Sequence, residues 1–507
     1  MDTSAFLIAA AVGYDWLYDW LGQERRDIIA EAIYKHGLCL VQQQFSVQSS
    51  GYSYIRSTNN WASVVNAGII MACMAIGDDY EEYQPVLKDV FESACMALEY
   101  VYSEFAPDGA WFEGPGYSIY TTHYLKYVLS SMETAFGYCL NHDSSKGLDR
   151  APWFLIDMAG PQGWNFMHDT GNHPMSGAQL AAEGQDGLWW GAHYDSPELT
   201  VAMASFMKQH SIPGGAQELI QTNFDHLSTP LTSIPLDNMY RNVEYGVLRD
   251  DYGTGDEMWV SFHGGSNQFG HAHFDAGTFC FDALGERWAT DIGADDYNLP
   301  EWGYSHGKYY VVRAEGHNVP VINPDEEGGQ NNTPIISTIT EFESCDEQGG
   351  YAILDLSVDY AEEDAKKVLR GFSLMDGRKS LTIRDEITLE KEDSEVYWFM
   401  HMEQGTDVSI QGDHAILTKN GKQMRVDFVT NGKNAVLSEM KCEPLPTSPQ
   451  GYVGTFDLND YYKKLAIKTT ASGELNITVK LTPLDGRTTD FTVDTTPLAQ
   501  WKDKVTK

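Results

Sequence analysis

Basic residues are scarce in this sequence. Its 507 residues include 34 lysines and arginines against 73 aspartates and glutamates, a formal net charge of −39. A protein that binds nucleic acid needs a basic face for the phosphate backbone. Nucleic acid is therefore not an expected partner, and an acidic ligand would have to meet a local basic cleft on an acidic body.

Cysteine motifs are also lacking. The seven cysteines are an odd number, and no two of them form a C-x-x-C motif. Several fall in apolar helical stretches. This pattern predicts reduced thiols in the core and argues against a disulfide framework.

A leader peptide and a membrane span are both missing from the first twenty residues. This stretch has no basic n-region, and Asp15 interrupts its apolar run. The sequence as it stands therefore predicts a cytoplasmic protein with no membrane partner. A secreted or periplasmic protein stays open if the N-terminus is truncated, because the chain starts as if inside a helical array.

The sequence divides into two halves with different patterns of apolar residues. A chain of this length is also too long for one ordinary hydrophobic core. Residues 1–225 show helical periodicity, and a serine followed by proline at 196–197 predicts a helix start. Apolar inner helices paired with more polar outer ones favour an α/α toroid, although periodicity alone does not separate a toroid from a helical solenoid. The predicted helices cover residues 24–38, 59–79, 81–105, 121–140 and 196–210.

Residues 226–507 show strand patterns instead. Tight-turn signals stand between them at Asp376-Gly377, Asn420-Gly421 and Asn431-Gly432. We expect an antiparallel β-sandwich, with a small separate C-terminal sheet from about residue 400 left open. The expected fold class is a multidomain α+β protein, in which an α/α toroid precedes the sandwich.

The stretch GHAHFDAGTF at 270–279 places two histidines side by side. On a strand, alternate side chains share a face, so His271, His273 and Asp275 would point one way. With Asp291 and His317 downstream, imidazole and carboxylate groups of this kind are ligands that zinc takes. Ordinary polar residues around turns are the alternative, because no short fixed spacing such as H-E-x-x-H is present.

Four segments together resemble the heparinase II/III-like polysaccharide lyases, a group that includes lyases for uronate polymers and alginate. They are residues 59–68, 107–125, 270–300 and 309–323, and the last two are the most specific. The resemblance covers most of the chain in order, but family members usually carry further helices before the segment YDWLYDWLG. It implies an α/α toroid, incomplete here, followed by a β-sandwich.

The resemblance also implies a reaction. Such lyases break a glycosidic bond next to a uronic acid by β-elimination, which requires the substrate carboxylate to be neutralised and the weakly acidic C5 proton to be removed. Asn60 resembles the residue that neutralises the carboxylate, with Asn59 left to cap the helix. Tyr117, held in a rigid loop by Gly114–Gly116, resembles the family's acid and base. His271 resembles the histidine that faces the cleft from the β-domain.

Further roles follow from the same resemblance. His273, Asp291 and His317 resemble the ligands of one structural zinc ion that aims His271 at the cleft, and Asp275 ranks behind Asp291. Substrate contacts are expected from Tyr304, His123 and Arg313. Arg313 could equally pair with Glu315 on so acidic a chain.

The expected function is thus a lyase for a glycosaminoglycan, such as heparan, chondroitin or hyaluronan, that leaves a 4,5-unsaturated uronate. An alginate or other polyuronate lyase is the alternative. From other classes, a zinc-dependent hydrolase or a non-catalytic carbohydrate-binding protein stays open. The polymer, the need for sulfate, exo or endo action and the oligomeric state, a dimer included, are not determined by the sequence.

Overall fold

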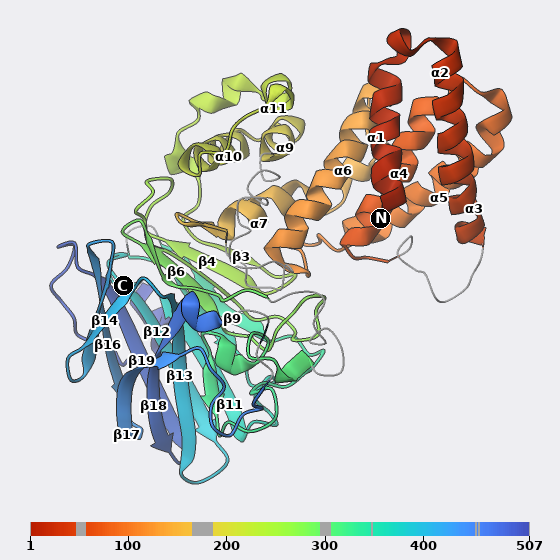
Figure 1. Cartoon of the computed structure of the whole chain (residues 1–507). Helices are drawn as coiled ribbons and strands as arrows, with labels where there is room; N and C mark the ends of the chain where they lie inside the picture. Colours follow the sequence, from red (N-terminus) through yellow and green to blue (C-terminus); the bar gives the residue numbers. More distant parts are fainter. Residues whose placement is uncertain are drawn as a thin grey trace.

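Helices fill the first half of the chain and strands the second (Figure 1). The computed structural model describes residues 2–46, 57–164, 186–294, 306–345, 348–451, 454 and 457–505. The α-helices are α1 Asp2–Trp16, α2 Tyr18–Ile33, α3 Cys39–Ser46, α4 Asn60–Ile76, α5 Gln84–Ser103, α6 Gly114–Phe136, α7 Ala151–Asp157, α9 Gly187–His193, α10 Pro197–Gln209, α11 Ala216–Gln221 and α12 Lys502–Val505. In the described part of the chain, no helix is both long and apolar enough to cross a membrane.

Helix α4 is the buried centre of the helical half. Nearly all of its side chains are apolar, and it packs against α1, α5 and α6. A helix that is apolar all round has to be enclosed by others, which confirms the prediction for this segment. Ser196 caps α10, since its hydroxyl accepts a hydrogen bond from the amide of Leu199.

Helix α6 begins earlier than its periodicity predicts. It starts at Gly114, with Pro115 in its first turn, where a missing amide hydrogen is tolerated. The prediction that Gly114–Gly116 form a loop is therefore wrong, because they are the first helical residues. Tyr117 consequently projects from the N-terminal turn of a long helix.

Within the described residues, the strands form three large antiparallel sheets and one hairpin. A five-stranded sheet has the order β3-β4-β5-β6-β7, an eight-stranded sheet the order β14-β15-β16-β19-β12-β11-β10-β9, and a four-stranded sheet the order β17-β18-β13-β8. The strands are β1 Ala159–Gly160, β2 Gly163–Trp164, β3 Asn238–Tyr240, β4 Tyr245–Arg249, β5 Trp259–His263, β6 Phe279–Ala283, β7 Glu286–Ala289, β8 Pro320–Ile322, β9 Thr338–Glu343, β10 Tyr351–Asp355, β11 Ala365–Ser373, β12 Leu381–Leu389, β13 Ser394–Glu403, β14 Asp407–Ile410, β15 His414–Lys419, β16 Lys422–Thr430, β17 Lys433–Lys441, β18 Tyr462–Ala471 and β19 Glu474–Pro483.

The turns predicted at Asn420-Gly421 and Asn431-Gly432 connect their strands in different ways. Asn420-Gly421 joins β15 to β16 in a two-residue hairpin, and both turn residues have positive φ angles, as this turn type requires. Asn431-Gly432 instead links β16 to β17, which belong to two different sheets. The apolar faces of the sheets meet in one core, where Phe262 stacks on Phe372 with ring centroids 4.4 Å apart.

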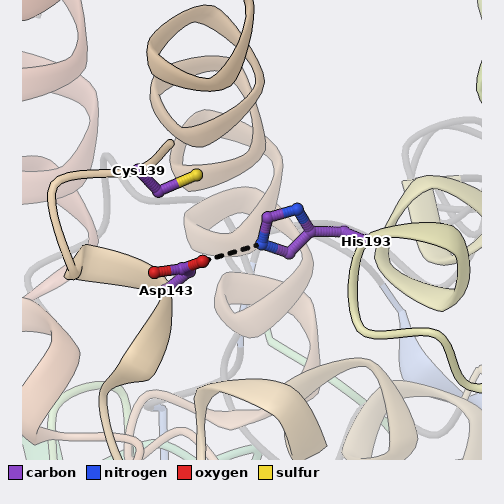
Figure 2. Close-up of side chains that lie close together, drawn as sticks. All are labelled: Cys139, Asp143 and His193. Atoms are coloured by element: carbon purple, nitrogen blue, oxygen red, sulfur yellow. Dashed lines mark ion pairs between the residues drawn. The ribbon is translucent and has the colours of Figure 1, made fainter. Parts of the chain in front are cut away.

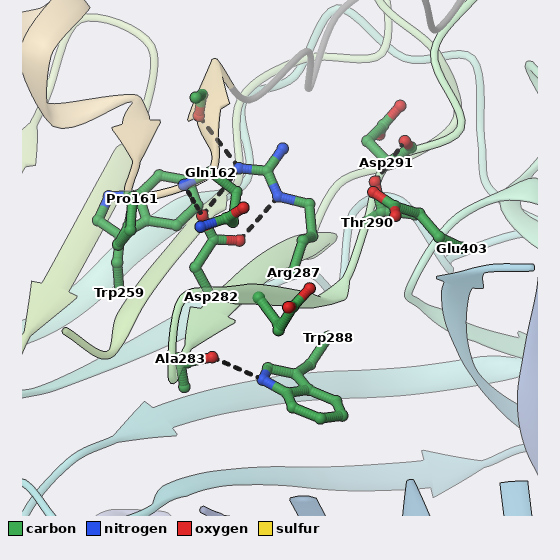
Figure 3. Close-up of polar contacts among 12 residues, drawn as sticks. Pro161, Gln162, Trp259, Asp282, Ala283, Arg287, Trp288, Thr290, Asp291 and Glu403 are labelled. Atoms are coloured by element: carbon green, nitrogen blue, oxygen red, sulfur yellow. Dashed lines mark hydrogen bonds and ion pairs between the residues drawn. The ribbon is translucent and has the colours of Figure 1, made fainter. Parts of the chain in front are cut away.

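Buried polar groups join the helical half to the five-stranded sheet. Asp157, at the end of α7, accepts hydrogen bonds from Arg249 (2.9 Å) and from the Tyr240 hydroxyl (2.6 Å). Near the hairpin β1–β2, Asp282 accepts from the amide of Gln162 and pairs with Arg287, as Figure 3 shows. These contacts fix the sheet against the helices.

The histidine-rich stretch is not a strand. Residues 270–278 form turns and irregular backbone, and β6 starts only at Phe279. The prediction of a strand with His271, His273 and Asp275 on one face is therefore wrong. Each of these side chains instead meets different partners.

Candidate active site

Asn60 lies at the start of α4, beneath the surface. Its side-chain amide donates to Glu113 (2.9 Å to Oε1 and 3.1 Å to Oε2), and its backbone N–H donates to Oε2 (2.7 Å). Asn59 occupies the N-cap position, but its side chain accepts from Ser57 and makes no capping hydrogen bond. Asn60 therefore does not face an open groove, because its amide is committed to Glu113.

Glu113 is the central buried acid of this site, and the sequence reasoning missed it. It is 2% exposed and also accepts a hydrogen bond from the indole of Trp111 (3.0 Å). Burial raises the pKa of this carboxyl, although its hydrogen bonds with Asn60 and Trp111 oppose the shift. The available signal was its place directly before the Gly-Pro-Gly turn, four residues ahead of Tyr117.

Tyr117 and His271 meet across the two halves of the molecule. Their rings stack with centroids 4.2 Å apart and an angle of 20° between planes. The Nε2 atom of His271 lies 3.6 Å from Oε1 of Glu113. Tyr117 is partly exposed and the His271 side chain is 20% exposed, so a ligand can reach both rings while Glu113 stays beneath them.

The backbone brings His271 to this place at some cost. Its φ angle is 66°, in the left-handed region that non-glycine residues seldom adopt. The preceding residue packs so closely on the helical half that a Cβ on Gly270 would lie 3.3 Å from Glu113 and from Phe112. Backbone strain of this kind gathers at functional sites, where the surrounding structure holds it.

Three predicted residues from distant parts of the sequence therefore share one site. Asn60 and Tyr117 come from the helical half and His271 from the sheet half, and Glu113 contacts both Asn60 and His271. A phenol and an imidazole in contact can accept and donate protons at one place. The arrangement is suited to acid–base chemistry on a ligand that lies along the two exposed rings.

The three predicted metal ligands, His273, Asp291 and His317, lie close together, and Asp275 lies among them. Asp275, Asp291 and His317 offer ligand atoms that all lie within 4.8 Å of one another. His273 lies beside them, with its ring centroid 5.2 Å from that of His317. Asp275, ranked second in the sequence analysis, thus belongs to the group, and it also lies 3.3 Å from Nε2 of His263.

This group is buried and has unsatisfied polar atoms. Both ring nitrogens of His317 and Oδ2 of Asp291 make no hydrogen bond within the described part of the chain. His317 and Asp291 approach to 3.4 Å. Buried polar atoms rarely lack partners, and nitrogen and carboxylate ligands are those of zinc, so these residues fit such an ion.

The predicted substrate contacts fare differently. His123 on α6 is partly exposed, and its Nδ1 lies 2.6 Å from Asp186, which also pairs with the buried Lys126. Arg313 is 2% exposed and pairs with Glu315 at 3.0 Å. The structure thus shows the ion pair that was the alternative to a substrate contact for Arg313. Tyr304 lies outside the described residues.

Comparison with known proteins agrees with this architecture. Residues 236–471 match the family described as Heparinase II/III-like, C-terminal. A search of curated protein sequences gives no significant match. Among solved structures, a heparinase III superposes with a TM-score of 0.65 and 12% identity, over 94% of this chain and 67% of that one.

Two further structures show the same fold. The heparan sulfate lyase HepC from Pedobacter heparinus gives a TM-score of 0.63 at 12% identity, over 93% of this chain and 64% of that chain. The chondroitin AC lyase of Streptomyces coelicolor A3, solved with chondroitin sulphate, gives 0.50 at 11%, over 94% and 66%. This chain therefore spans about two thirds of their length. The expected fold class, a helical toroid followed by antiparallel sheets, is confirmed.

Proposed function

We propose that this chain, whose residues 236–471 match the Heparinase II/III-like C-terminal family, is a polysaccharide lyase. It cleaves next to a uronic acid by β-elimination and leaves an unsaturated uronate. The observation that carries the proposal is the stack of Tyr117 on His271, one ring from each half of the molecule, with His271 3.6 Å from Glu113. The compared structures with this fold, a heparinase III, a heparan sulfate lyase and a chondroitin AC lyase, support it.

The two rings divide the proton transfers. One removes the C5 proton of the uronate and the other donates a proton to the departing glycosidic oxygen, so that the C4–O bond breaks as the C4–C5 double bond forms. Tyr117 is the group that can do either step, and His271 is its partner for one C5 epimer. Both side chains are partly exposed, so a sugar can contact them.

Asn60 and Glu113 support these rings. Neutralising the substrate carboxylate is the role proposed for the Asn60 amide, and it requires this amide to leave Glu113 or to share its second hydrogen. Burial raises the pKa of Glu113, which disfavours its charged form beneath an acidic sugar. Glu113 is a positioning residue, acting through its contacts with Asn60 and His271.

We assign one structural zinc ion to the buried group of His273, Asp275, Asp291 and His317. A bound zinc supplies positive charge that fixes its ligands, and His271 is two residues from His273 in the same loop. The burial of these residues keeps a substrate away from the ion, which disfavours a zinc-dependent hydrolase.

The test is a substrate panel read by ultraviolet absorbance of the unsaturated product. Heparan sulfate, chondroitin sulfate, hyaluronan and alginate cover both the glycosaminoglycan and the polyuronate alternatives. With the best substrate, Tyr117→Phe should lower kcat by about 10²–10⁴-fold and keep binding, because the acid–base group is gone. Tyr124→Phe, at another partly exposed tyrosine of α6, is the matched control.

Three outcomes contradict the proposal. Cleavage without absorbing product indicates a hydrolase, and binding without turnover indicates a carbohydrate-binding protein. Turnover that survives Tyr117→Phe removes the proposed acid–base residue.

A further inference from the structure

A second cluster of metal-ligand side chains lies at the opposite end of α6 from Tyr117. Cys139 follows the end of this helix, Asp143 lies in the short 3₁₀-helix His142–Ser144, and His193 ends α9. Figure 2 shows the three side chains pointing toward one another from these elements. Their ligand atoms all lie within 4.8 Å of one another.

His193 is held in place, and among the described residues its Nδ1 makes no hydrogen bond. Its side chain is 6% exposed, and its ring stacks on Trp189 with centroids 4.5 Å apart. Nε2 lies 3.5 Å from Asp143, and Nδ1 lies 3.6 Å from Glu133. Within the described residues the ring makes no hydrogen bond, and its Nδ1 is a buried atom without a partner. A carboxylate behind a histidine is the arrangement that orients metal-binding imidazoles.

Cys139 completes the cluster with a thiol. The residue is 3% exposed, and its Sγ donates a weak hydrogen bond to the carbonyl oxygen of Leu129 (3.4 Å). The carboxylate of Asp143 faces the same cluster, and a cation held there offsets its negative charge.

We propose that Cys139, Asp143 and His193 bind a divalent cation of the zinc class, through sulfur, carboxylate oxygen and Nε2. One sulfur, one nitrogen and one oxygen are the ligand types of tetrahedral zinc, in which neighbouring ligand atoms stand roughly 3.3–3.8 Å apart. The present spacing needs only a small closure to reach this geometry. The thiol proton passes to solvent as the sulfur–metal bond forms, and water fills the fourth position.

The cation acts as a clamp in the helical half. It ties the end of α6 to α9 through the turn that follows α6, far along the helix from Tyr117. This site is independent of the proposed lyase reaction and of the buried group around His317, which has no cysteine among its four side chains.

Cobalt titration of metal-stripped protein tests the proposal. Co²⁺ bound to a thiolate gives a sulfur-to-metal absorption band in the near ultraviolet, which a site of histidine and aspartate alone does not give. The wild type should show this band, saturating at one equivalent of thiolate-bound cobalt. Cys345→Ser, at a half-buried cysteine of the sheet half, is the control and should behave like the wild type.

The variants decide the outcome. Cys139→Ser should abolish the band, and His193→Gln should weaken cobalt binding at least about tenfold because it loses one of three protein ligands. Far-ultraviolet circular dichroism checks that each variant is folded. If Cys139→Ser does not fold, His193→Gln still tests the site. A wild type without the band, or a band that persists in Cys139→Ser, overturns the proposal. The lyase assay does not affect this result.

Discussion

At the scale of single residues, the site is organised around the carboxyl of Glu113, whose role no sequence motif indicated. Glu113 receives three hydrogen bonds from Asn60 and one from Trp111, and it faces His271 at 3.6 Å. A buried acid with so many partners fixes the groups around it more than it reacts itself. Its contribution to turnover should therefore appear through the orientation of His271.

The substitution Glu113→Gln tests this role. Glutamine keeps the size and one acceptor oxygen but removes the ionisable carboxyl beside His271. We expect kcat to fall by about 10–100-fold with a much smaller change in KM, because supporting partners of functional histidines have effects of this size. Steady-state kinetics against Glu92→Gln, at an exposed glutamate of α5, measure the effect. Equal losses in both variants would contradict a specific role.

Glu363 provides a residue-scale prediction of pH dependence. Burial, reinforced by Asp325 and Glu327, raises the pKa of this carboxyl to about 7. The folded state therefore holds the proton more tightly than the unfolded chain, whose glutamates titrate near about 4.3. The free energy of unfolding must fall as pH rises between these two values, because the folded protein pays to ionise the buried group.

Glu363→Gln should remove this loss of stability with rising pH. Between pH 5 and pH 8, the free energy of unfolding of the variant should rise relative to the wild type by roughly 2 kcal/mol. Urea unfolding at the two pH values measures the difference. Glu362→Gln removes the same charge from an exposed neighbour and should leave the pH dependence unchanged. If both variants shift alike, the burial of Glu363 is not the cause.

At the scale of elements, the start of α6 decides where Tyr117 points. Gly114 has a φ angle of 85°, in the left-handed region, and Gly137 at the other end of the helix has 80°. Alanine in this region is strained by about 1–2 kcal/mol. Only the strain at Gly114 lies within one turn of Tyr117.

Paired substitutions at the two ends of α6 should therefore separate stability from activity. Gly114→Ala and Gly137→Ala should each lower the free energy of unfolding by about 1–2 kcal/mol. Gly114→Ala should in addition lower kcat, since it changes the turn that carries Tyr117. Urea unfolding and steady-state kinetics of both variants check this. Comparable kcat values would show that the turn does not position the tyrosine.

The elements also show what could be predicted from the sequence. α4 was predictable because almost every one of its residues is apolar, which only an enclosed helix tolerates. The stretch 270–278 was not, since its alternation of polar and apolar residues imitates a strand. Its polar side chains instead have distant partners: Asp275 lies beside His263, and His273 lies beside His317. Such contacts between distant segments leave no local periodicity.

The site residues divide in the same way. Asn60, Tyr117 and His271 were identified through resemblance and do converge through Glu113, but the amide of Asn60 turned out to be engaged. The sequence left two possible partners for Arg313, an acidic substrate or Glu315, because charge balance alone does not decide between them. The structure shows Glu315. Glu113 was missed because its place before Gly114–Gly116 marks an unusual backbone position but does not show that the side chain becomes buried when the halves of the chain pack together.

At the scale of the whole molecule, function requires the two halves to stay in register, because Tyr117 and His271 come from opposite sides. Asp157 is a main connection. Its carboxylate accepts hydrogen bonds from Arg249, Tyr240 and Asn238, and its backbone carbonyl accepts one from the indole of Trp259. Arg249 is 2% exposed, so its buried positive charge needs the carboxylate of Asp157 to balance it.

Asp157→Ala should lower the free energy of unfolding by about 3–5 kcal/mol, because it leaves the buried guanidinium of Arg249 unpaired. Adding Arg249→Met should recover part of this loss, since a buried apolar side chain is tolerated where an unpaired charge is not. Glu443→Gln breaks an ion pair with Lys441 whose side chains are 53% and 73% exposed, and should change stability by less than about 1 kcal/mol. Urea unfolding of the four proteins measures these differences. Under conditions where Asp157→Ala remains folded, its kcat should still fall, because the sheet that positions His271 is held less firmly against α7. A folded Asp157→Ala variant with unchanged kcat would mean that the other contacts between the halves suffice to align the two rings.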